Sequence, residues 1–99
     1  MAIIYHITSV NQWENALEQG FYTDPSLQSE GFIHCSQDHQ VEGVLERYFS
    51  GRENLLKLVI DTAQLRSPLQ FDLAPSINEE FPHIYGPLNL DSVVEVVRI

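Results

Sequence analysis

Residues 2–20, AIIYHITSVNQWENALEQG, combine a strand pattern with a capped helix and set the beginning of the fold. Their first seven residues are rich in β-branched and aromatic side chains, which favours a strand over residues 2–8. Ser9 and Gln12 have the spacing of a helix capping box, and Gly20 is placed to end the helix in a left-handed conformation. We expect the buried face of this helix to consist of Val10, Trp13, Ala16 and Leu17.

The rest of the chain predicts one more helix and several strands. Residues 31–36 favour a short strand, and Ser36 is expected to cap a helix that runs to about Ser50 and stops at Gly51. The nearly continuous apolar run at 55–61 predicts a strand that is covered on both faces. Further strands are expected over 69–73, 83–85 and 93–99, a helical turn over 62–65, and loops over 21–30 and 74–82. Helices come early and strands late, which indicates an α+β fold rather than a doubly wound parallel sheet.

The composition is that of a single globular domain. The chain has 99 residues, of which 43% are hydrophobic and 19% charged. No segment approaches the roughly 20 apolar residues of a membrane span, and the first residues lack a signal-peptide pattern. The single cysteine, Cys35, excludes an intramolecular disulfide and a metal cluster made of cysteines alone. We therefore expect a reduced, cytoplasmic setting.

The charge balance is strongly acidic. Fourteen acidic residues face five basic ones, which gives a net charge of −9 with neutral histidines. Affinity for phosphate backbones comes largely from Lys and Arg, so we expect no nucleic-acid partner and no membrane partner. Solubility explains such acidity, and a basic partner is the alternative. The oligomeric state is left open.

Three of the four histidines share a local pattern, in which a hydroxyl side chain follows two residues later. The pairs are His6 with Thr8, His34 with Ser36, and His83 with Tyr85. Residues i and i+2 of a strand point to the same face, so each pair can present an imidazole and a hydroxyl together, while Ile7, Cys35 and Ile84 point into the core. The pattern predicts a polar cleft that orients a small ligand by hydrogen bonds and moves protons near neutral pH.

Other interpretations of these residues stay open. Each histidine could be a hydrogen-bonded structural residue, and three histidines could hold a metal, although they lack the close spacing of common zinc motifs. Glu79 and Glu80 precede His83 and could orient it or act as a base, or they could be solvated loop acids. Gly31 could allow a ligand to approach the backbone closely, or it could serve a turn.

Three segments resemble the hallmark segments of a small bacterial family, the domain of unknown function 952 family. They are residues 4–8 (IYHIT), 30–36 (EGFIHCS) and 81–88 (FPHIYGPL), in this order. The resemblance covers nearly the whole chain, which is also of about the family's length. It implies no particular activity.

The opening residues 4–20 are more distantly similar to the start of ADP-ribosyltransferase-fold proteins, notably the branch of DNA-modifying toxins. That fold is a split pair of small antiparallel or mixed β-sheets with helices, and it clasps NAD in a cleft. The resemblance would place His6 where the ribose of NAD is held, with Thr8 beside it, and residues 32–36 at the nicotinamide. The position that steers the ribose 2′-hydroxyl would fall at Glu80 or His83.

Three classes of function follow from these observations. The first is an ADP-ribosyltransferase-like enzyme, or a degenerate relative, that binds NAD or a related nucleotide as its substrate. In it His6, His34, Glu80 and His83 are the candidate catalytic residues, and the candidate ligand-binding residues are Thr8, Gly31, Ser36 and Tyr85. The second is a noncatalytic module that binds a small ligand or a protein, and the third is a histidine-dependent hydrolase. No resident cofactor is expected.

Overall fold

The computed structural model describes residues 2–99, which form three α-helices and eight strands. The helices are α1 (Val10–Gln19), α2 (Pro25–Ser29) and α3 (Val41–Tyr48). The strands are β1 (Ile3–Ser9), β2 (Phe21–Tyr22), β3 (Ile33–His34), β4 (Leu55–Asp61), β5 (Leu69–Ala74), β6 (Glu79–Ile84), β7 (Leu88–Asn89) and β8 (Val93–Arg98). Single turns of 3₁₀ helix occur at Asp38–Gln40, Thr62–Gln64 and Leu90–Ser92.

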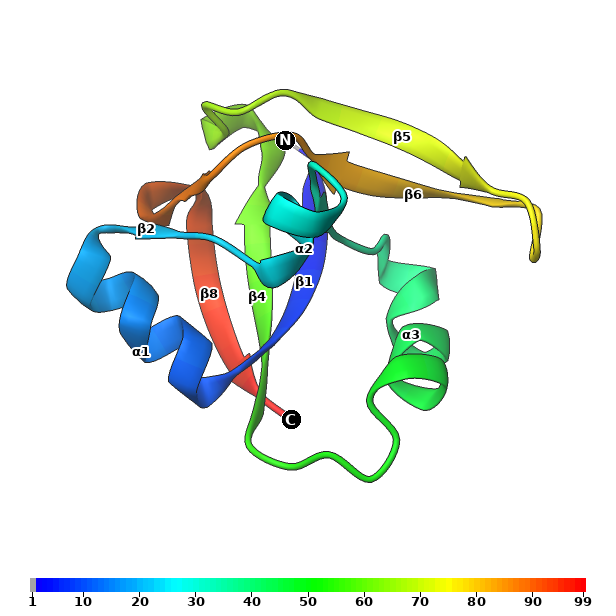
Figure 1. The fold of residues 1–99 in the computed structure, drawn as a ribbon, viewed down its shortest axis with the longest axis horizontal. Coiled ribbons are helices and arrows are strands. Elements are labelled where there is room, and N and C mark those ends of the chain that lie inside the picture. The colour runs from blue at the N-terminus through cyan, green and yellow to red at the C-terminus, as the bar shows by residue number, and fades with distance from the viewer. Residues whose placement is uncertain (1) are drawn as a thin grey trace.

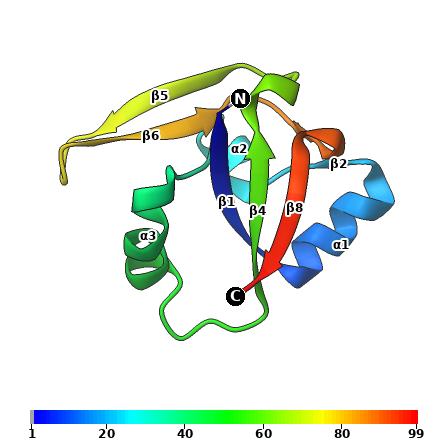
Figure 2. The same ribbon diagram turned by 180° about the vertical axis from the view of Figure 1, so that it is seen from behind.

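The strands form three small antiparallel sheets. One has the order β1-β4-β8, the second β3-β6-β5, and the third pairs β2 with β7. Figures 1 and 2 show the first sheet upright, with the β5–β6 hairpin crossing its upper end and projecting over α3, and with α1 on the other side. The fold is therefore α+β, as expected. Antiparallel or mixed sheets were expected, and all the strand pairs in residues 2–99 are antiparallel.

Residues 33–36 join the two larger sheets. Ile33 and His34 pair with β6, and the N–H of Cys35 donates to the carbonyl of Pro82 (3.0 Å). At the next residue the chain changes partner, because Ser36 and Tyr5 of β1 exchange main-chain hydrogen bonds of 2.7 and 2.9 Å. A single extended segment is thus bonded to β6 on one side and to β1 on the other.

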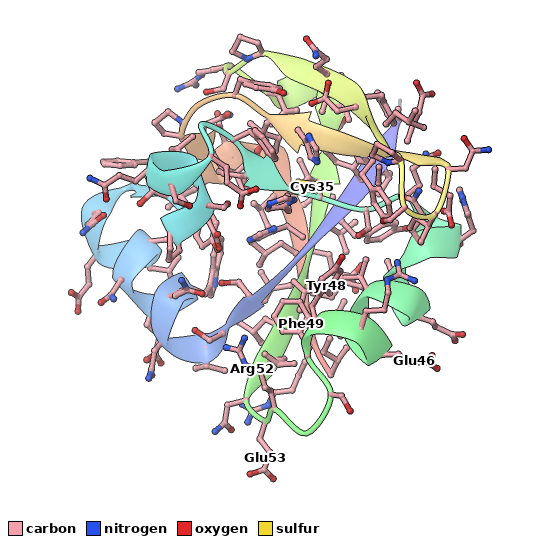
Figure 3. All side chains as sticks on the ribbon, turned by 45° about the vertical axis from the view of Figure 1, so that its right-hand side comes forward. Cys35, Glu46, Tyr48, Phe49, Arg52 and Glu53 are labelled. Atoms are coloured by element: carbon pink, nitrogen blue, oxygen red, sulfur yellow. The ribbon has the colours of Figure 1, made fainter. Side chains whose placement is uncertain are left out.

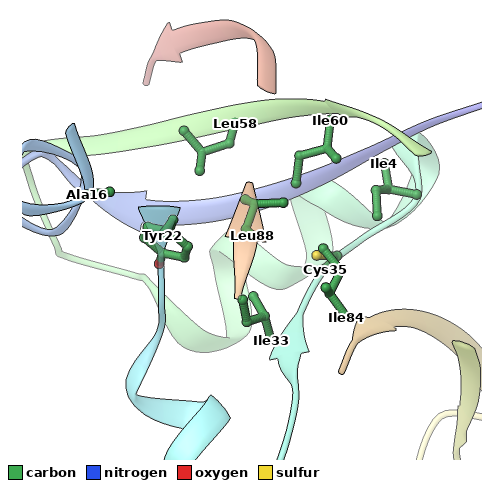
Figure 4. Close-up of a cluster of buried hydrophobic side chains, with 9 residues drawn as sticks. All are labelled: Ile4, Ala16, Tyr22, Ile33, Cys35, Leu58, Ile60, Ile84 and Leu88. Atoms are coloured by element: carbon green, nitrogen blue, oxygen red, sulfur yellow. The ribbon is translucent and has the colours of Figure 1, made fainter. Parts of the chain in front are cut away.

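The main core lies between the two larger sheets. Leu58 and Ile60 of β4 meet Ile33 of β3 and Ile84 of β6, and all four side chains are fully buried (Figure 4). A second cluster covers the opposite side of the first sheet, where Leu55 and its neighbours pack against α3. Both faces of β4 are therefore covered, as its apolar run predicted.

Several predicted elements are confirmed closely. β4 occupies residues 55–61, and the predicted turn at 62–65 is the 3₁₀ turn Thr62–Gln64. The first helix begins after Ser9, whose Oγ accepts from the N–H of Gln12 (3.1 Å). It ends at Gly20, which has a φ of 90° and whose N–H donates to Ala16. Each signal is local, so it needs no tertiary information.

Other predictions were wrong, and for the missed strands the reason is pairing with distant segments. Residues 21–30 are not a loop: Phe21 and Tyr22 pair with β7, and Asp24 caps α2. Residues 79–82 are not a loop either, because they pair with β5 as the first part of β6. Ser36 does not cap the second helix, since it bonds to Tyr5, and α3 begins later, at Val41.

The first helix buries less than its sequence predicts. Ala16 is buried and Trp13 half-buried, whereas Leu17 is 57% exposed. Within residues 2–99, none of the helices has the length and apolar character that crossing a membrane requires.

Gly86 is required by its packing. A Cβ at this position would lie 2.5 Å from Ser67 Oγ and 2.9 Å from Ser67 Cβ. We expect Gly86→Ala to lower the free energy of unfolding by about 1–3 kcal/mol, because the added Cβ is both overpacked and disfavoured by the φ of 156°. Adding Ser67→Gly should recover only the steric part of the loss. Urea unfolding measures both. Gly51→Ala is the control, because its positive φ of 78° gives it a backbone cost but nothing lies within 4 Å of its Cβ, so Ser67→Gly should not affect it. A Gly86→Ala protein as stable as wild type would contradict this account.

Candidate functional site

A cleft of about 670 Å³ lies between α3 and the β5–β6 hairpin. Its floor comes from β1 and from the segment that joins the two sheets, and its walls come from α3 and the hairpin. His6, His34 and His83 all line it, although they belong to three different strands. The structure therefore brings together the three histidines that the sequence singled out. A volume of this size is typical of small-molecule sites.

His6 forms the buried part of this cleft and is 4% exposed. Its Nδ1 donates to the main-chain oxygen of His34 (2.5 Å), and its Nε2 lies 2.8 Å from the hydroxyl of Tyr22. Strand alternation places His6 and Thr8 on the side of β1 opposite Ile7, as predicted. Both nitrogens of His6 have partners within the protein, so its ring holds β1, β2 and β3 together.

The hydroxyl of Tyr22 is the centre of a buried polar network. It lies 2.9 Å from Thr8 Oγ1 and 2.9 Å from Asp24 Oδ1, and Tyr22 itself is fully buried. A carboxylate only accepts hydrogen bonds, so Tyr22 donates its proton to Asp24 Oδ1, and His6 Nε2 and Thr8 Oγ1 contact the same hydroxyl oxygen. Burial raises the pKa of Tyr22 well above its ordinary value. The hydroxyl therefore stays protonated and serves as a structural donor.

Asp24 contributes a negative charge to this network. Burial works against its charged form, but the hydrogen bond and charge of His6 and the hydrogen bonds of Ser26 prevail and hold its pKa well below its ordinary range. Its Oδ2 accepts from the N–H of Ser26 (3.1 Å), which caps α2. The same carboxylate thus fixes α2 and completes the floor of the cleft.

His34 and His83 lie side by side at the open part of the cleft. They are opposite each other in the β3–β6 pair, and their ring centroids are 5.1 Å apart. His34 Nε2 pairs with Glu30 at 3.0 Å, in a contact where both side chains are about half exposed. Ser36, the hydroxyl partner of His34, also lines the cleft but is buried. His34 is thus the most accessible of the three histidines.

His83 is held by a carboxylate that the sequence analysis did not select. Its Nδ1 donates to Asp72 Oδ2 (2.7 Å), and the hydroxyl of Tyr85 donates to the same oxygen. Gln70 donates to the other oxygen, Oδ1. The hydrogen bonds of Tyr85, Gln70 and His83 lower the pKa of Asp72 to about 2. The ring of Phe32 stacks on His83 with centroids 4.0 Å apart.

Two of the three predicted pairs share a partner. The Tyr22 hydroxyl contacts both His6 and Thr8, and Asp72 Oδ2 accepts from both His83 and Tyr85. The i, i+2 spacing is therefore used to aim an imidazole and a hydroxyl at one oxygen. The hydrogen bond from Tyr85 raises that residue's pKa.

Several predicted site residues lie outside the cleft. Glu80 is exposed on the face of β6 opposite His83, and its carbonyl oxygen accepts from Gln40 (2.8 Å). The carboxylate of Glu79 accepts from the same buried side chain (3.1 Å). Gly31 ends the loop after α2 with a φ of 90° and has nothing within 4 Å of a Cβ position. Thr8 and Tyr85 do not line the cleft either. Tyr85 bonds to Asp72, which does line it, whereas Thr8 bonds to Tyr22 beneath the floor.

Asp72, Tyr22 and Asp24 are the functional side chains that sequence reasoning missed. The sequence does contain a pattern that points to Asp72. Gln70 and Asp72 form the polar side of the predicted strand over 69–73, and a histidine lies in a neighbouring predicted strand. Tyr22 and Asp24 fell in a predicted loop, where no periodicity showed that they are buried. Cys35 packs in the core, and burial raises the pKa of its thiol. Among residues 2–99 no group of three His, Cys, Asp or Glu side chains is placed to hold a metal.

The family model described as Protein of unknown function (DUF952) matches residues 7–96. The chain belongs to the DUF952 family. It is similar to the X-ray structure of protein CC0527 from Caulobacter crescentus, with a TM-score of 0.88 and 29% identity, covering 97% of this chain and 84% of that one. The solution NMR structure of CC0527 gives a TM-score of 0.84 and 29% identity over 100% and 85% of the two chains. Among curated proteins nothing matches.

The first test of this DUF952 site concerns its buried hydroxyl. Tyr22→Phe removes the group that His6, Thr8 and Asp24 share, so we expect the free energy of unfolding to fall by about 1–3 kcal/mol. Tyr48→Phe, at a side chain that is 68% exposed, is the matched control and should stay within about 0.5 kcal/mol of wild type. Urea unfolding followed by Trp13 fluorescence measures both. Equal losses in the two variants would contradict the network.

The second test uses the lowered pKa of Asp24. Because its folded pKa lies below its unfolded pKa, its contribution to stability is present above about pH 4 and is lost as the pH falls further. We expect Asp24→Asn to be less stable than wild type near neutral pH, and the difference to shrink below about pH 4. Glu18→Gln, at an exposed carboxyl of α1, should show no such trend. A difference that is constant with pH would count against the assignment.

Proposed function

We propose that the cleft binds NAD or a closely related nucleotide, in the manner of ADP-ribosyltransferase-like proteins. The observation that carries this proposal is the lining of the cleft, where His34 and His83 stand next to Glu30 and Asp72. The split arrangement of two small sheets that meet at one cleft supports it as well. The split sheets, and the positions of His34 and His83, agree with what the resemblance of residues 4–20 implies, whereas Glu30 and Asp72 were not part of it.

The open end of the cleft suits a flat cationic ring joined to a sugar. Its aromatic side chains are His34 and His83, and the carboxylates of Glu30 and Asp72 add negative charge. The nicotinamide of NAD is a planar ring with a positive charge, and positive charge spreads to the ribose as the glycosidic bond weakens. Carboxylates held in place stabilise such charge without rearranging. This end therefore fits the nicotinamide ribose better than a polyphosphate.

The other end of the cleft is apolar and aromatic. It lies between the end of α3, with Tyr48 and Phe49, and the hairpin, with Leu73 and Ile77. Figure 3 shows Tyr48 and Phe49 on the side of α3 that faces the rest of the molecule, whereas Glu46 points outward. An adenine ring can stack on such side chains. Arg47, the one Lys or Arg among the cleft-lining residues, sits at this end and can pair with a pyrophosphate.

The sequence-predicted residues have different roles in this proposal, because some of them line the cleft and others support it from below. His6, His34, His83 and Ser36 line the cleft, with His6 at its buried floor, whereas Thr8 supports that floor through Tyr22. Of the two candidates for steering the ribose 2′-hydroxyl, His83 lies at the cleft and Glu80 does not. A noncatalytic binding module would use the same lining, so binding and turnover have to be measured separately.

Thermal unfolding with NAD, ADP-ribose or nicotinamide tests the proposal. A ligand at about 100 times its Kd stabilises a protein by about 2.7 kcal/mol, which raises the Tm of a domain of this size by several degrees. We expect NAD and ADP-ribose at millimolar concentration to produce such a shift. His34→Ala should abolish it, because this side chain is exposed at the cleft and its loss leaves the core intact.

His39→Ala is the matched control for that variant. His39 is exposed on the 3₁₀ turn before α3 and does not line the cleft, so its removal should leave the thermal shift unchanged. Absence of a shift with all three compounds would overturn the nucleotide proposal. A shift that His34→Ala retains would mean that the nucleotide binds elsewhere.

A further inference from the structure

We propose that Asp72 and His83 form an acid–base dyad that activates water for hydrolysis of the bond between nicotinamide and ribose. This inference rests on the proposed function, because it names the reaction that the same cleft performs. His83 is predictable from the sequence but Asp72 is not, because the carboxylates near His83 along the chain are Glu79 and Glu80. In this proposal His83 is the base, Asp72 is the partner that orients it, and water is the nucleophile.

The hydrogen bonds determine which nitrogen of His83 is available. Asp72 accepts only, since its lowered pKa keeps it a carboxylate, so the proton of a neutral His83 lies on Nδ1. Nε2 then carries the lone pair, and it has no hydrogen-bond partner among residues 2–99. Every buried side-chain nitrogen and oxygen of the described chain has a partner. Nε2 is therefore accessible, and His83 lines the cleft.

Both members of the dyad are held rigidly. Asp72 accepts hydrogen bonds from Gln70, Tyr85 and His83 at once. The imidazole is fixed from a second direction by the stacked ring of Phe32, with an interplanar angle of 18°. The side chain of His83 is 12% exposed, so it reaches the cleft without being free to turn. A base held in this way loses little entropy when it meets its substrate.

The neighbouring pair of His34 and Glu30 has a different character. Its side chains are 52% and 49% exposed, and a contact of this kind contributes little and holds little in place. The bond to Glu30 also occupies Nε2 of His34. Of the two histidine–carboxylate pairs in the cleft, the one with Asp72 is therefore the one built to orient a base.

The chemistry of the bond requires only one base. As water attacks C1′ of the ribose, its proton passes to Nε2 of His83 and its oxygen forms the new bond. The bond from C1′ to the nicotinamide nitrogen breaks, and its electron pair stays on that nitrogen. The ring was a cation before cleavage, so nicotinamide leaves neutral and needs no acid. The proton on His83 returns to solvent.

Steady-state kinetics with NAD as substrate test the dyad, with release of nicotinamide as the readout. His83→Gln should lower kcat by about 100-fold or more, which is the usual contribution of a general base. Asp72 acts through His83 as a positioning residue, so Asp72→Asn should lower kcat with KM nearly unchanged. Asp91→Asn is the matched control, because Asp91 is an exposed carboxylate with a lowered pKa whose Arg66 contact lies outside the cleft. Its kcat should equal that of wild type.

An NMR measurement separates orientation from folding. The ¹⁵N shifts of His83 in wild type should report a proton on Nδ1, and Asp72→Asn should remove this preference while the remaining spectrum keeps its dispersion. A wild-type protein that gives no thermal shift with NAD, ADP-ribose or nicotinamide would overturn the proposed function. A protein that binds NAD but releases no nicotinamide, or an Asp72→Asn variant with wild-type kcat, would overturn the dyad alone.

Discussion

The hydrogen bond from the His6 ring to the main-chain oxygen of His34 is the contact on which the rest of the site depends. It lies where the segment 33–36 leaves the second sheet and joins β1, so it fixes the position of one sheet against the other. The other nitrogen of the same ring meets Tyr22, which ties in the segment that leads to α2. The floor of the cleft is therefore made of side chains whose hydrogen bonds are satisfied within the protein.

Histidine serves two purposes in this molecule, and burial separates them. His6 is enclosed and both of its nitrogens are bonded, so it contributes to structure. His83 is bonded at one nitrogen only, and its other nitrogen reaches the cleft. The residue type and the i, i+2 pattern are the same in both cases. The difference comes from what the tertiary structure places against the second nitrogen.

The cleft is lined by acidic side chains, in keeping with the acidity of the whole chain. Asp24, Glu30 and Asp72 line it, and Arg47 stands alone among the lining residues as a basic side chain. Each of the three carboxylates has a histidine as its partner, within 3.5 Å. Further hydrogen bonds hold Asp24 and Asp72 at defined positions, and negative charge held in this way favours a ligand that carries or develops positive charge.

Local signals in the sequence determined the elements that are stabilised by contacts between residues close together along the chain. The helix cap at Ser9, the stop at Gly20, the apolar run of β4 and the alternation that separates His6 from Ile7 are of this kind, and so is the α+β order of elements. Residues 21–22 and 79–82 could not be assigned, because their structure comes from pairing with β7 and β5, whereas the helix at 25–29 begins at a local cap, Asp24, that was interpreted as a turn. The sequence also singled out the three histidines, but only the tertiary structure decided that Asp72, rather than Glu80, is the carboxylate of His83. The physical reason is strand parity: neighbours along β6 point to opposite faces, and the partner of a histidine comes from the adjacent strand.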